Sequence, residues 1–280
     1  MTRVATSSAG RVAFVGAGPG QADLITLRGA QRLQSADVIL FDSLADPALC
    51  ELAPNARWID VGKRGFSGLP HAPRGGRENT GQDTINALLV KHAQSGANVV
   101  RLKGGDPSVF GRLEEELEAL AAAGIESEVV PGVTAALAAA AATQRPLTRR
   151  GAGRSVALTT AVTKSGDLAA GRHADTESFY MAGKQLAALS RRLVEAGWPA
   201  ATPALVVSRA GWPDQIASEH AVATLGDATV LHSGRPTIVT VGVGAAQVGA
   251  ATDGTGAAPP AATTPATAAP ASTRVTTSTP

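Results

Sequence analysis

The sequence predicts an α/β protein of two α/β domains, with a mainly parallel sheet in the first domain and a mixed sheet in the second. Short apolar strands alternate with helix-like stretches through residues 11–142, a rhythm typical of parallel sheets. This rhythm breaks at the polar stretch 146–151 and then restarts. In the second half, two strand-like runs flank the short turn 211–214, which implies antiparallel neighbours.

Composition is typical of a soluble protein with one large or two small α/β domains, and it argues against several classes of protein. The chain has 280 residues, of which 44% are hydrophobic and 17% charged, with a net charge of +2, so it can bury sizeable cores. The basic residues form no long block, and charge therefore gives no indication of nucleic-acid binding. The single cysteine, Cys50, cannot form an intramolecular disulfide, and no Cys/His cluster has zinc-ligand spacing, so we expect no metal site.

The ends of the chain are predicted to be disordered, and the boundary between domains is placed at 150/151. Residues 1–10 are short and polar without an apolar segment typical of a secretory signal, and no apolar run reaches membrane length. We therefore expect a cytoplasmic protein with no membrane partner. The domains are predicted at 11–150 and 151–247, and the Ala/Thr/Pro-rich stretch 248–280 is expected to be a disordered tail.

The first strand, 11–15, is an apolar run that leads directly into the glycine turn 16–20. A helix through Leu33 follows, capped by either Asp23 or Thr26, because both side chains can accept a hydrogen bond from the first helical turn.

The second strand, 38–41, ends at Asp42, and a short helix begins at Asp46 and Pro47. The third strand, 57–61, delivers the basic, glycine-containing segment 62–65 to the same edge of the sheet.

An amphipathic helix at 82–92 leads into the central strand, 99–103, which ends in a turn with two glycines and an aspartate. Gly104 and Gly105 allow the backbone to approach a ligand closely, and Asp106 offers a hydrogen-bond acceptor. In an open α/β sheet, ligands bind at this edge. An ordinary connection in which Asp106 caps the next helix is the alternative.

The remaining elements follow from periodicity and from their terminating residues. The expected helices are 114–123, closed by Gly124, the alanine-rich stretch 135–142, and 185–196; the expected strands are 128–130, 155–160, 178–181, 204–208, 215–224 and 236–242.

The glycine turn after the first strand also has the outline of a nicotinamide dinucleotide site, with Asp42 in place to bind ribose hydroxyls. Gln21 stands where the third glycine of that fingerprint belongs, and Pro19 stiffens the turn. An NAD-dependent oxidoreductase is therefore the less favoured interpretation.

Taken together, the turns resemble those of the tetrapyrrole methylase family over residues 12–243. The motifs that carry the resemblance are VGAGPG at 15–20 with DLITL at 23–27, ADV at 36–38 with Asp42, GKR at 62–64, RLKGGDP at 101–107 with VFGR at 109–112, VPGVTA at 130–135, PLT at 146–148 and FYM at 179–181. Several ordered motifs at family-like spacing are far more specific than one glycine loop.

The resemblance implies two domains with an active-site cleft between them, a homodimer, and S-adenosyl-L-methionine bound in the cleft and released as S-adenosyl-L-homocysteine. It also implies transfer of two methyl groups to uroporphyrinogen III, giving precorrin-2 for siroheme or cobalamin synthesis. Carried over by motif, the cofactor contacts are Pro19, Gly104, Gly105, Asp106, Val109, Thr134, Ala135 and Met181, and Ala210 is added by its spacing before Gln215. Backbone groups of the glycine loops are expected to hold the polar ends of the cofactor.

Asp42 and Lys63 match the proton acceptor and donor that the resemblance implies, and a turn role for Asp42 or carboxylate binding by Lys63 are the alternatives. The expected substrate carries eight carboxylates, so arginines should line the cleft. Arg64, Arg112 and Arg150 are the candidates, and each is alternatively a solvated surface charge.

Four segments depart from the family pattern, namely the long stretch 65–80, the residues 113–116 after Arg112, the tract after Gly151 and the stretch 161–176. These departures leave open a methylase of a later corrin precursor, such as precorrin-2 itself, or a protein that binds the cofactor without turnover.

Overall fold

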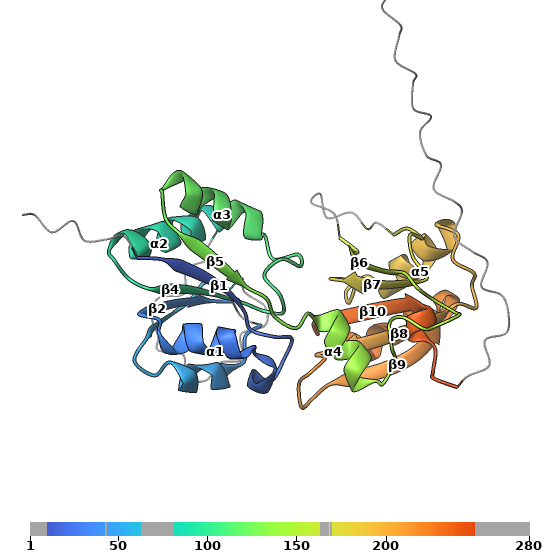
Figure 1. Ribbon diagram of the computed structural model, residues 1–280. Helices are drawn as coiled ribbons and strands as arrows, with labels where there is room; N and C mark the ends of the chain where they lie inside the picture. The colour runs from blue at the N-terminus through green and yellow to red at the C-terminus, as the bar shows by residue number, and fades with distance from the viewer. Residues whose placement is uncertain (1–9, 43, 63–80, 163–167, 169, 250–280) are drawn as a thin grey trace, which may run out of the picture.

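The computed structural model describes residues 10–42, 44–62, 81–162, 168 and 170–249, which form two lobes, each built on a five-stranded sheet (Figure 1). Both predicted sheet types are confirmed. Lys63 and Arg64 lie outside the described residues, as do residues 1–9 and 250–280, which make up most of the predicted disordered ends 1–10 and 248–280. No helix in the described part of the chain is long and apolar enough to cross a membrane.

The first sheet is entirely parallel, with the strand order β3-β2-β4-β1-β5. Its strands are β1 (Val12–Gly16), β2 (Val38–Phe41), β3 (Arg57–Asp60), β4 (Val99–Lys103) and β5 (Ser127–Val130). The chain leaves β1 toward β2 on one side and leaves β4 toward β5 on the other. Such a divergence of connections opens a crevice at the carboxyl ends of the strands, where ligands bind in open α/β sheets.

Helices cover both faces of this sheet. One face packs against α1 (Leu27–Gln34) and the 3-10 helix η2 (Pro47–Leu52), and the other packs against α2 (Gln82–Gln94) and α3 (Leu113–Ala122). Of the two expected caps, Thr26 is the one used at α1, because its hydroxyl accepts from the N–H of Gly29 at 3.1 Å.

The second sheet is mixed, with the strand order β6-β7-β10-β8-β9. Its strands are β6 (Val156–Thr160), β7 (Thr176–Tyr180), β8 (Pro203–Ser208), β9 (Ile216–Ala221) and β10 (Thr237–Gly242), and only β6 and β7 pair in parallel. The helix α5 (Leu186–Glu195) and the 3-10 helix η3 (Val222–Ala228) cover one face. The short helices η1 (Ala22–Leu24), α6 (Thr229–His232) and η4 (Val243–Ala245) complete the described elements.

The alanine-rich helix α4 (Ala135–Ala142) packs on the other face of the second sheet, although it precedes residue 150 (Figure 1). Its buried residues Ala138 and Ala139 belong to one apolar cluster with Leu205 and Val207 of β8 and Ile238 of β10. Small side chains permit this close approach, and α4 therefore joins the end of β5 in one lobe to the core of the other.

The predicted strand 215–224 is too long, because β9 ends at Ala221 and η3 follows. The N–H of Ala221 donates to the hydroxyl of Thr224 at 3.1 Å, and the carbonyl of Val222 accepts from the Ser190 hydroxyl at 2.7 Å. Packing of the buried Val222 against α5 thus overrides its preference for a strand.

Candidate functional site

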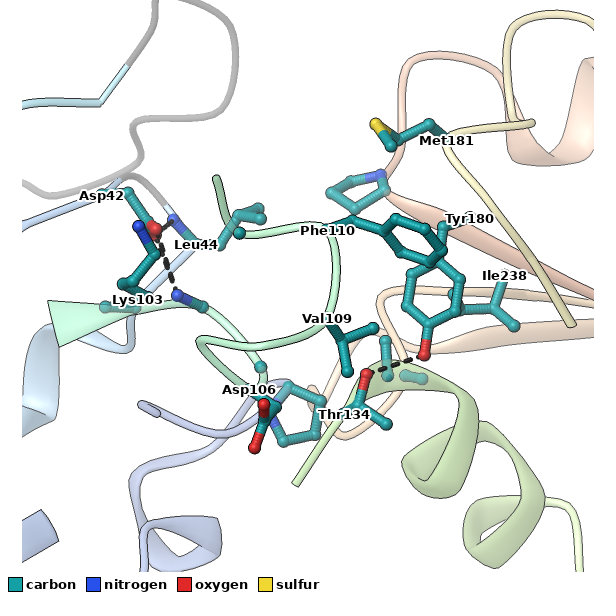
Figure 2. A pocket seen from close by; sticks show the side chains of 18 of the residues that line it. Asp42, Leu44, Lys103, Asp106, Val109, Phe110, Thr134, Tyr180, Met181 and Ile238 are labelled. Atoms are coloured by element: carbon teal, nitrogen blue, oxygen red, sulfur yellow. Dashed lines mark hydrogen bonds between the residues drawn. The ribbon is translucent and has the colours of Figure 1, made fainter. Parts of the chain in front are cut away.

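A cavity of about 720 Å³ lies between the lobes, at the carboxyl ends of β1, β2 and β4. Its volume falls within the range of roughly 300–1,000 Å³ typical of small-molecule sites. The second lobe contributes residues from the ends of β7, β8 and β10 to the opposite wall. Figure 2 shows a close view of this cavity, with side chains from both lobes pointing into it.

Three glycines bring the turns after β1, β4 and β5 into backbone contact. A Cβ on Gly132 would lie 2.3 Å from the carbonyl oxygen of Gly105, and one on Gly16 would lie 2.6 Å from the Cα of Gly132. Gly105 has a φ of +70°, which favours glycine. The three turns therefore form one compact floor beneath the cavity.

Asp106 links the turn after β4 to the turn after β5 by hydrogen bonds. Its carboxylate accepts from the N–H of Ser108 at 2.7 Å and from the N–H of Gly132 at 2.8 Å. The alternative in which it caps the next helix is wrong, because α3 begins at Leu113 after Arg112.

Asp42 lies at the end of β2 on the cavity wall. Its carboxylate accepts from the N–H of Gly104 at 3.1 Å and from the N–H of Leu44 at 3.1 Å (Figure 2). The N–H of Gly105 donates to the carbonyl of Gly18 at 2.7 Å. The N–H groups of Gly104 and Gly105 are therefore both bonded within the protein, and the expectation that backbone groups of the glycine loops hold the cofactor stays a prediction.

Beside Asp42 lies a buried ionic cluster that the sequence analysis did not anticipate. Glu116 of α3, with 0% exposure, accepts from Arg101 Nε at 3.0 Å and from Lys103 Nζ. Arg101 and Lys103 also line the cavity. Two cations two positions apart on a buried strand point to one face of the sheet, and this spacing is the signal that could have revealed the cluster.

The wall in the second lobe is organised by Tyr180 at the end of β7. Its hydroxyl lies 2.7 Å from that of Thr134 and accepts from the N–H of Ala136 at 3.3 Å. Its ring packs against Phe110, with the ring centres 5.0 Å apart (Figure 2). Burial raises the pKa of Tyr180, so the phenol stays protonated near neutral pH.

Contacts between loops also join the lobes. The N–H of Gln21 donates to the carbonyl of Gly211 at 2.9 Å, and the indole N–H of Trp212 donates to the carbonyl of Pro19 at 3.1 Å. A Cβ on Gly20 would lie 2.3 Å from the oxygen of Gly211. The two loops therefore meet through direct backbone contact at Gly20 and Gly211 and through the Trp212 side chain.

The same loop geometry contradicts the dinucleotide interpretation. In such a site the helix N-terminus opens directly at the glycine turn and binds the pyrophosphate. Here η1 follows the turn and α1 begins only at Leu27.

Backbone strain is concentrated around the cavity. Four non-glycine residues that line the cavity have positive φ angles, namely Phe110 (53°), Arg112 (54°), Met181 (60°) and Arg209 (50°). Such conformations are uncommon for residues with a Cβ and cluster at functional sites.

Most of the predicted site residues lie together on this cavity. Its lining includes Asp42, Arg112 and all nine predicted cofactor contacts, namely Pro19, Gly104, Gly105, Asp106, Val109, Thr134, Ala135, Met181 and Ala210. Arg112 forms a two-point ion pair with Glu115, at 2.8 and 2.6 Å. Arg150 is exposed and is not part of the lining, and Lys63 and Arg64 lie outside the described residues.

Comparisons with known proteins agree with this geometry. The chain is 43% identical over 205 residues to a uroporphyrinogen-III C-methyltransferase of Pseudomonas aeruginosa, covering 72% of this chain and 80% of that protein. It is 42% identical over 240 residues to siroheme synthase 2 of Serratia proteamaculans, covering 83% of this chain but only 49% of that longer protein.

Among solved structures, the fold is similar to that of a uroporphyrin-III C-methyltransferase from Thermus thermophilus complexed with S-adenosylhomocysteine. The TM-score is 0.70 at 33% sequence identity, covering 83% of this chain and 97% of that structure. The family model named tetrapyrrole (corrin/porphyrin) methylases matches residues 11–228 of the sequence. The chain therefore belongs to the tetrapyrrole methylase family.

Proposed function

We propose that this protein is an S-adenosyl-L-methionine-dependent C-methyltransferase that converts uroporphyrinogen III into precorrin-2 by two successive methyl transfers. The observation that carries the proposal is the convergence of all nine predicted cofactor contacts on one cavity between the lobes. The relatives of the same name support this choice of substrate. The product would supply siroheme or cobalamin synthesis.

The cavity fits a nucleoside that carries an amino-acid arm. Its mixed lining combines apolar side chains such as Val109 and Ile238 with the Thr134 hydroxyl and the Asp106 carboxylate. Gly105 leaves room for a ligand to approach the backbone, because the position that a Cβ would occupy has no other atom within 3.8 Å. When bound, S-adenosylmethionine supplies an electrophilic methyl group on a sulfonium centre.

The chain itself would contribute orientation and a site for a proton. Aligning two reactants accounts for much of the acceleration of such a transfer. Asp42 would accept the proton that the alkylated substrate releases, because its carboxylate faces the cavity and is held by the N–H groups of Gly104 and Leu44. Lys63 is proposed as the proton donor on the resemblance alone.

Arginine side chains would bind the carboxylates of the substrate. Arg112 lies on the cavity wall, and its pairing with Glu115 fixes the guanidinium while leaving donors for a ligand. Arg64 and Arg150 are proposed for the same role from their motifs.

The decisive experiment is anaerobic incubation of the protein with S-adenosylmethionine and enzymatically generated uroporphyrinogen III, with products followed by mass spectrometry. We expect a gain of two methyl groups through a monomethyl intermediate. No gain with intact cofactor binding would instead favour a methylase of a later corrin precursor, tested by supplying precorrin-2. If neither substrate is methylated, the protein is a cofactor-binding module. Failure to bind the cofactor would contradict all three.

We also propose that the protein is cytoplasmic and that it forms a homodimer, the latter as the family resemblance implies. Sedimentation velocity at micromolar concentration should give the mass of two chains, and a monomer at all concentrations would contradict this.

A further inference from the structure

The part of the cavity wall that the second lobe supplies carries positive charge only. Three charged side chains of this lobe line the cavity, namely Lys184, Arg209 and Arg235, and the described lining from this lobe includes no carboxylate. The first lobe, in contrast, contributes both Asp42 and Asp106 together with its cations. An anionic group of a ligand is therefore attracted to the wall of the second lobe.

The second sheet brings Arg209 and Arg235 together. Its strands β8 and β10 are antiparallel neighbours (Figure 1), and their register places Ser208 opposite Thr237. Arg209 follows β8 and Arg235 closely precedes β10, so both leave the sheet at the same end. The N–H of Arg209 also donates to the carbonyl of Pro236 at 2.8 Å. Two strands thus deliver one arginine each to the same part of the cavity wall.

One carboxylate bridges the two arginines. Asp214 accepts from Arg209 Nε at 2.7 Å through one oxygen and from an Nη of Arg235 at 2.8 Å through the other. The hydrogen bond from Arg209, with a smaller contribution from Arg235, holds the pKa of Asp214 below its usual range, so this carboxylate is ionised at neutral pH. The group therefore has two cations and one anion, an excess of one positive charge.

Both guanidinium groups keep donors for a ligand. A guanidinium has five N–H donors, and in the described part of the chain Arg209 forms side-chain hydrogen bonds through its Nε alone. The Nε of Arg235 is buried and has no partner among the described residues. The two side chains are 27% and 26% exposed, and in such partly dehydrated surroundings a hydrogen bond to an anion is stronger than in water.

Packing and hydrogen bonds hold both arginines in place without a ligand. The Arg209 guanidinium packs over the Trp212 ring, 4.3 Å from its centre. The carbonyl of Arg235 accepts from the Thr237 hydroxyl at 2.8 Å, and that hydroxyl lies 2.9 Å from the hydroxyl of Ser208. Groups that are already ordered lose little conformational entropy when a ligand binds.

The chemistry of the donors decides which anion fits. The amino-acid end of S-adenosylmethionine carries an ammonium beside its carboxylate and needs an acceptor as well as donors, whereas both oxygens of Asp214 already accept from the arginines. The sulfonium of the cofactor adds a further positive charge. Uroporphyrinogen III, in contrast, has acetate and propionate arms without neighbouring ammonium groups, and a guanidinium matches a carboxylate in geometry.

We propose that Arg209 and Arg235, bridged by Asp214, form a subsite that binds a carboxylate arm of the tetrapyrrole substrate through their guanidinium N–H groups. This inference rests on the proposed function, and it adds a contact from the second lobe to the one proposed for Arg112 in the first. The two arginines bind and orient the substrate. Because a guanidinium stays protonated, neither exchanges a proton with it.

The test uses Arg209→Gln and Arg235→Gln, which keep much of the side-chain length but remove the charge. Arg192→Gln is the matched control, because Arg192 is an exposed arginine of α5 that pairs with Glu195 at 3.0 Å and does not line the cavity. Steady-state methylation of uroporphyrinogen III gives KM and kcat, and calorimetry gives the affinity for S-adenosylhomocysteine.

We expect each glutamine variant to raise the KM for uroporphyrinogen III by about 10-fold or more, because a charge-assisted hydrogen bond is lost. The kcat and the affinity for S-adenosylhomocysteine should change by less than about 3-fold, the pattern expected when only substrate binding is weakened. Arg192→Gln should match the wild type. An unchanged KM in either folded variant would overturn the proposal. Weaker S-adenosylhomocysteine binding with an unchanged KM would assign the arginines to the cofactor and would overturn it too.

The variants Arg209→Lys and Arg235→Lys cover the case in which a glutamine variant does not fold. Each keeps the positive charge but replaces the planar fork of donors by a point charge. We expect the KM to rise by about 3-fold or more at an unchanged kcat, since the bidentate geometry is lost. A wild-type KM in both lysine variants would contradict binding through the guanidinium N–H groups.

Binding of uroporphyrin III, the fluorescent oxidised form of the substrate, separates this inference from the proposed function. If the wild-type protein methylates no uroporphyrinogen III, the proposed function fails, and fluorescence titration decides the subsite by itself. Weaker uroporphyrin III binding by the two glutamine variants than by the wild type and Arg192→Gln would support the subsite. Equal titration curves for all of these proteins, including no binding by any of them, would overturn it.

Discussion

The indole N–H of Trp212 donates to the carbonyl of Pro19 at 3.1 Å, across the boundary between the two lobes. The Arg209 guanidinium packs over the indole ring at 4.3 Å from its centre. Because all three residues line the cavity, this contact couples the relative placement of the lobes to the shape of the site.

Trp212→Phe should weaken binding of S-adenosylhomocysteine by about 3- to 10-fold, since one hydrogen bond contributes roughly 0.5–1.5 kcal/mol. Calorimetric titration measures this change. Trp198→Phe is the matched control, because Trp198 donates to Gly171 within the second lobe. It should lower thermal stability and leave affinity unchanged. Equal affinities for the wild type and Trp212→Phe would show that the contact does not shape the site.

Asp106→Ala should reduce affinity for S-adenosylhomocysteine by more than about 10-fold, because it leaves two N–H groups of the cavity floor without an acceptor. The melting temperature should fall as well. Ser108→Ala serves as the control, since Ser108 contributes its backbone N–H rather than its hydroxyl to this contact. Unchanged affinity in Asp106→Ala by calorimetry would remove this residue from the site.

Tyr180→Phe should lower the free energy of unfolding by about 1–2 kcal/mol, because the phenol bonds to both Thr134 and the N–H of Ala136. The packing against Phe110 is kept, so the loss reports the hydroxyl. Urea denaturation of Tyr180→Phe, Thr134→Val and the double variant measures the coupling of the two hydroxyls. Strictly additive losses would contradict a direct bond.

Stability should fall as the pH drops below about 6.5, the ordinary value for histidine. Burial lowers the pKa of His232, whose ring bonds to Ser208 at 2.6 Å and Ser218 at 2.8 Å. The unfolded chain therefore binds a proton that the folded protein resists, so acid favours unfolding.

Urea denaturation between pH 8 and 5 tests this sign, with a slope of at most about 1.4 kcal/mol per pH unit from one group. His232→Asn should flatten the dependence, at the cost of some stability at pH 8. Burial, Arg57 and Lys91 lower the pKa of His92, so this residue also favours unfolding in acid. The variant His92→Gln measures its share of the pH dependence of stability. A profile unchanged in His232→Asn would contradict the assignment.

Sequence reasoning found the strands of both sheets because most are short apolar runs, and β9 follows the turn at 211–214 as a return strand. It extended β9 too far, since the turn at Val222 depends on Ser190 and on packing against α5, which lie far away in the sequence. It also could not show that α4 packs on the second sheet, because this alanine-rich helix has no polar face to reveal its orientation.

For the candidate site too, sequence reasoning found some features and missed others. Motifs picked out residues that the structure brings together on one cavity, because glycine turns at strand ends are local features. The Arg101–Glu116–Lys103 cluster was missed because it joins β4 to α3 and depends on which face of the helix points inward. The engaged N–H groups of Gly104 and Gly105 were missed for a similar reason, since their acceptors belong to other turns.

The positive φ angles of Phe110, Arg112, Met181 and Arg209 have a consequence for the evolution and engineering of this protein. Each such conformation costs on the order of 1–3 kcal/mol when a Cβ is present. Selection for heat resistance alone would therefore favour glycine or asparagine at these four positions. Each replacement would remove a side chain from the cavity wall, so gains in melting temperature at these positions should be accompanied by losses in turnover.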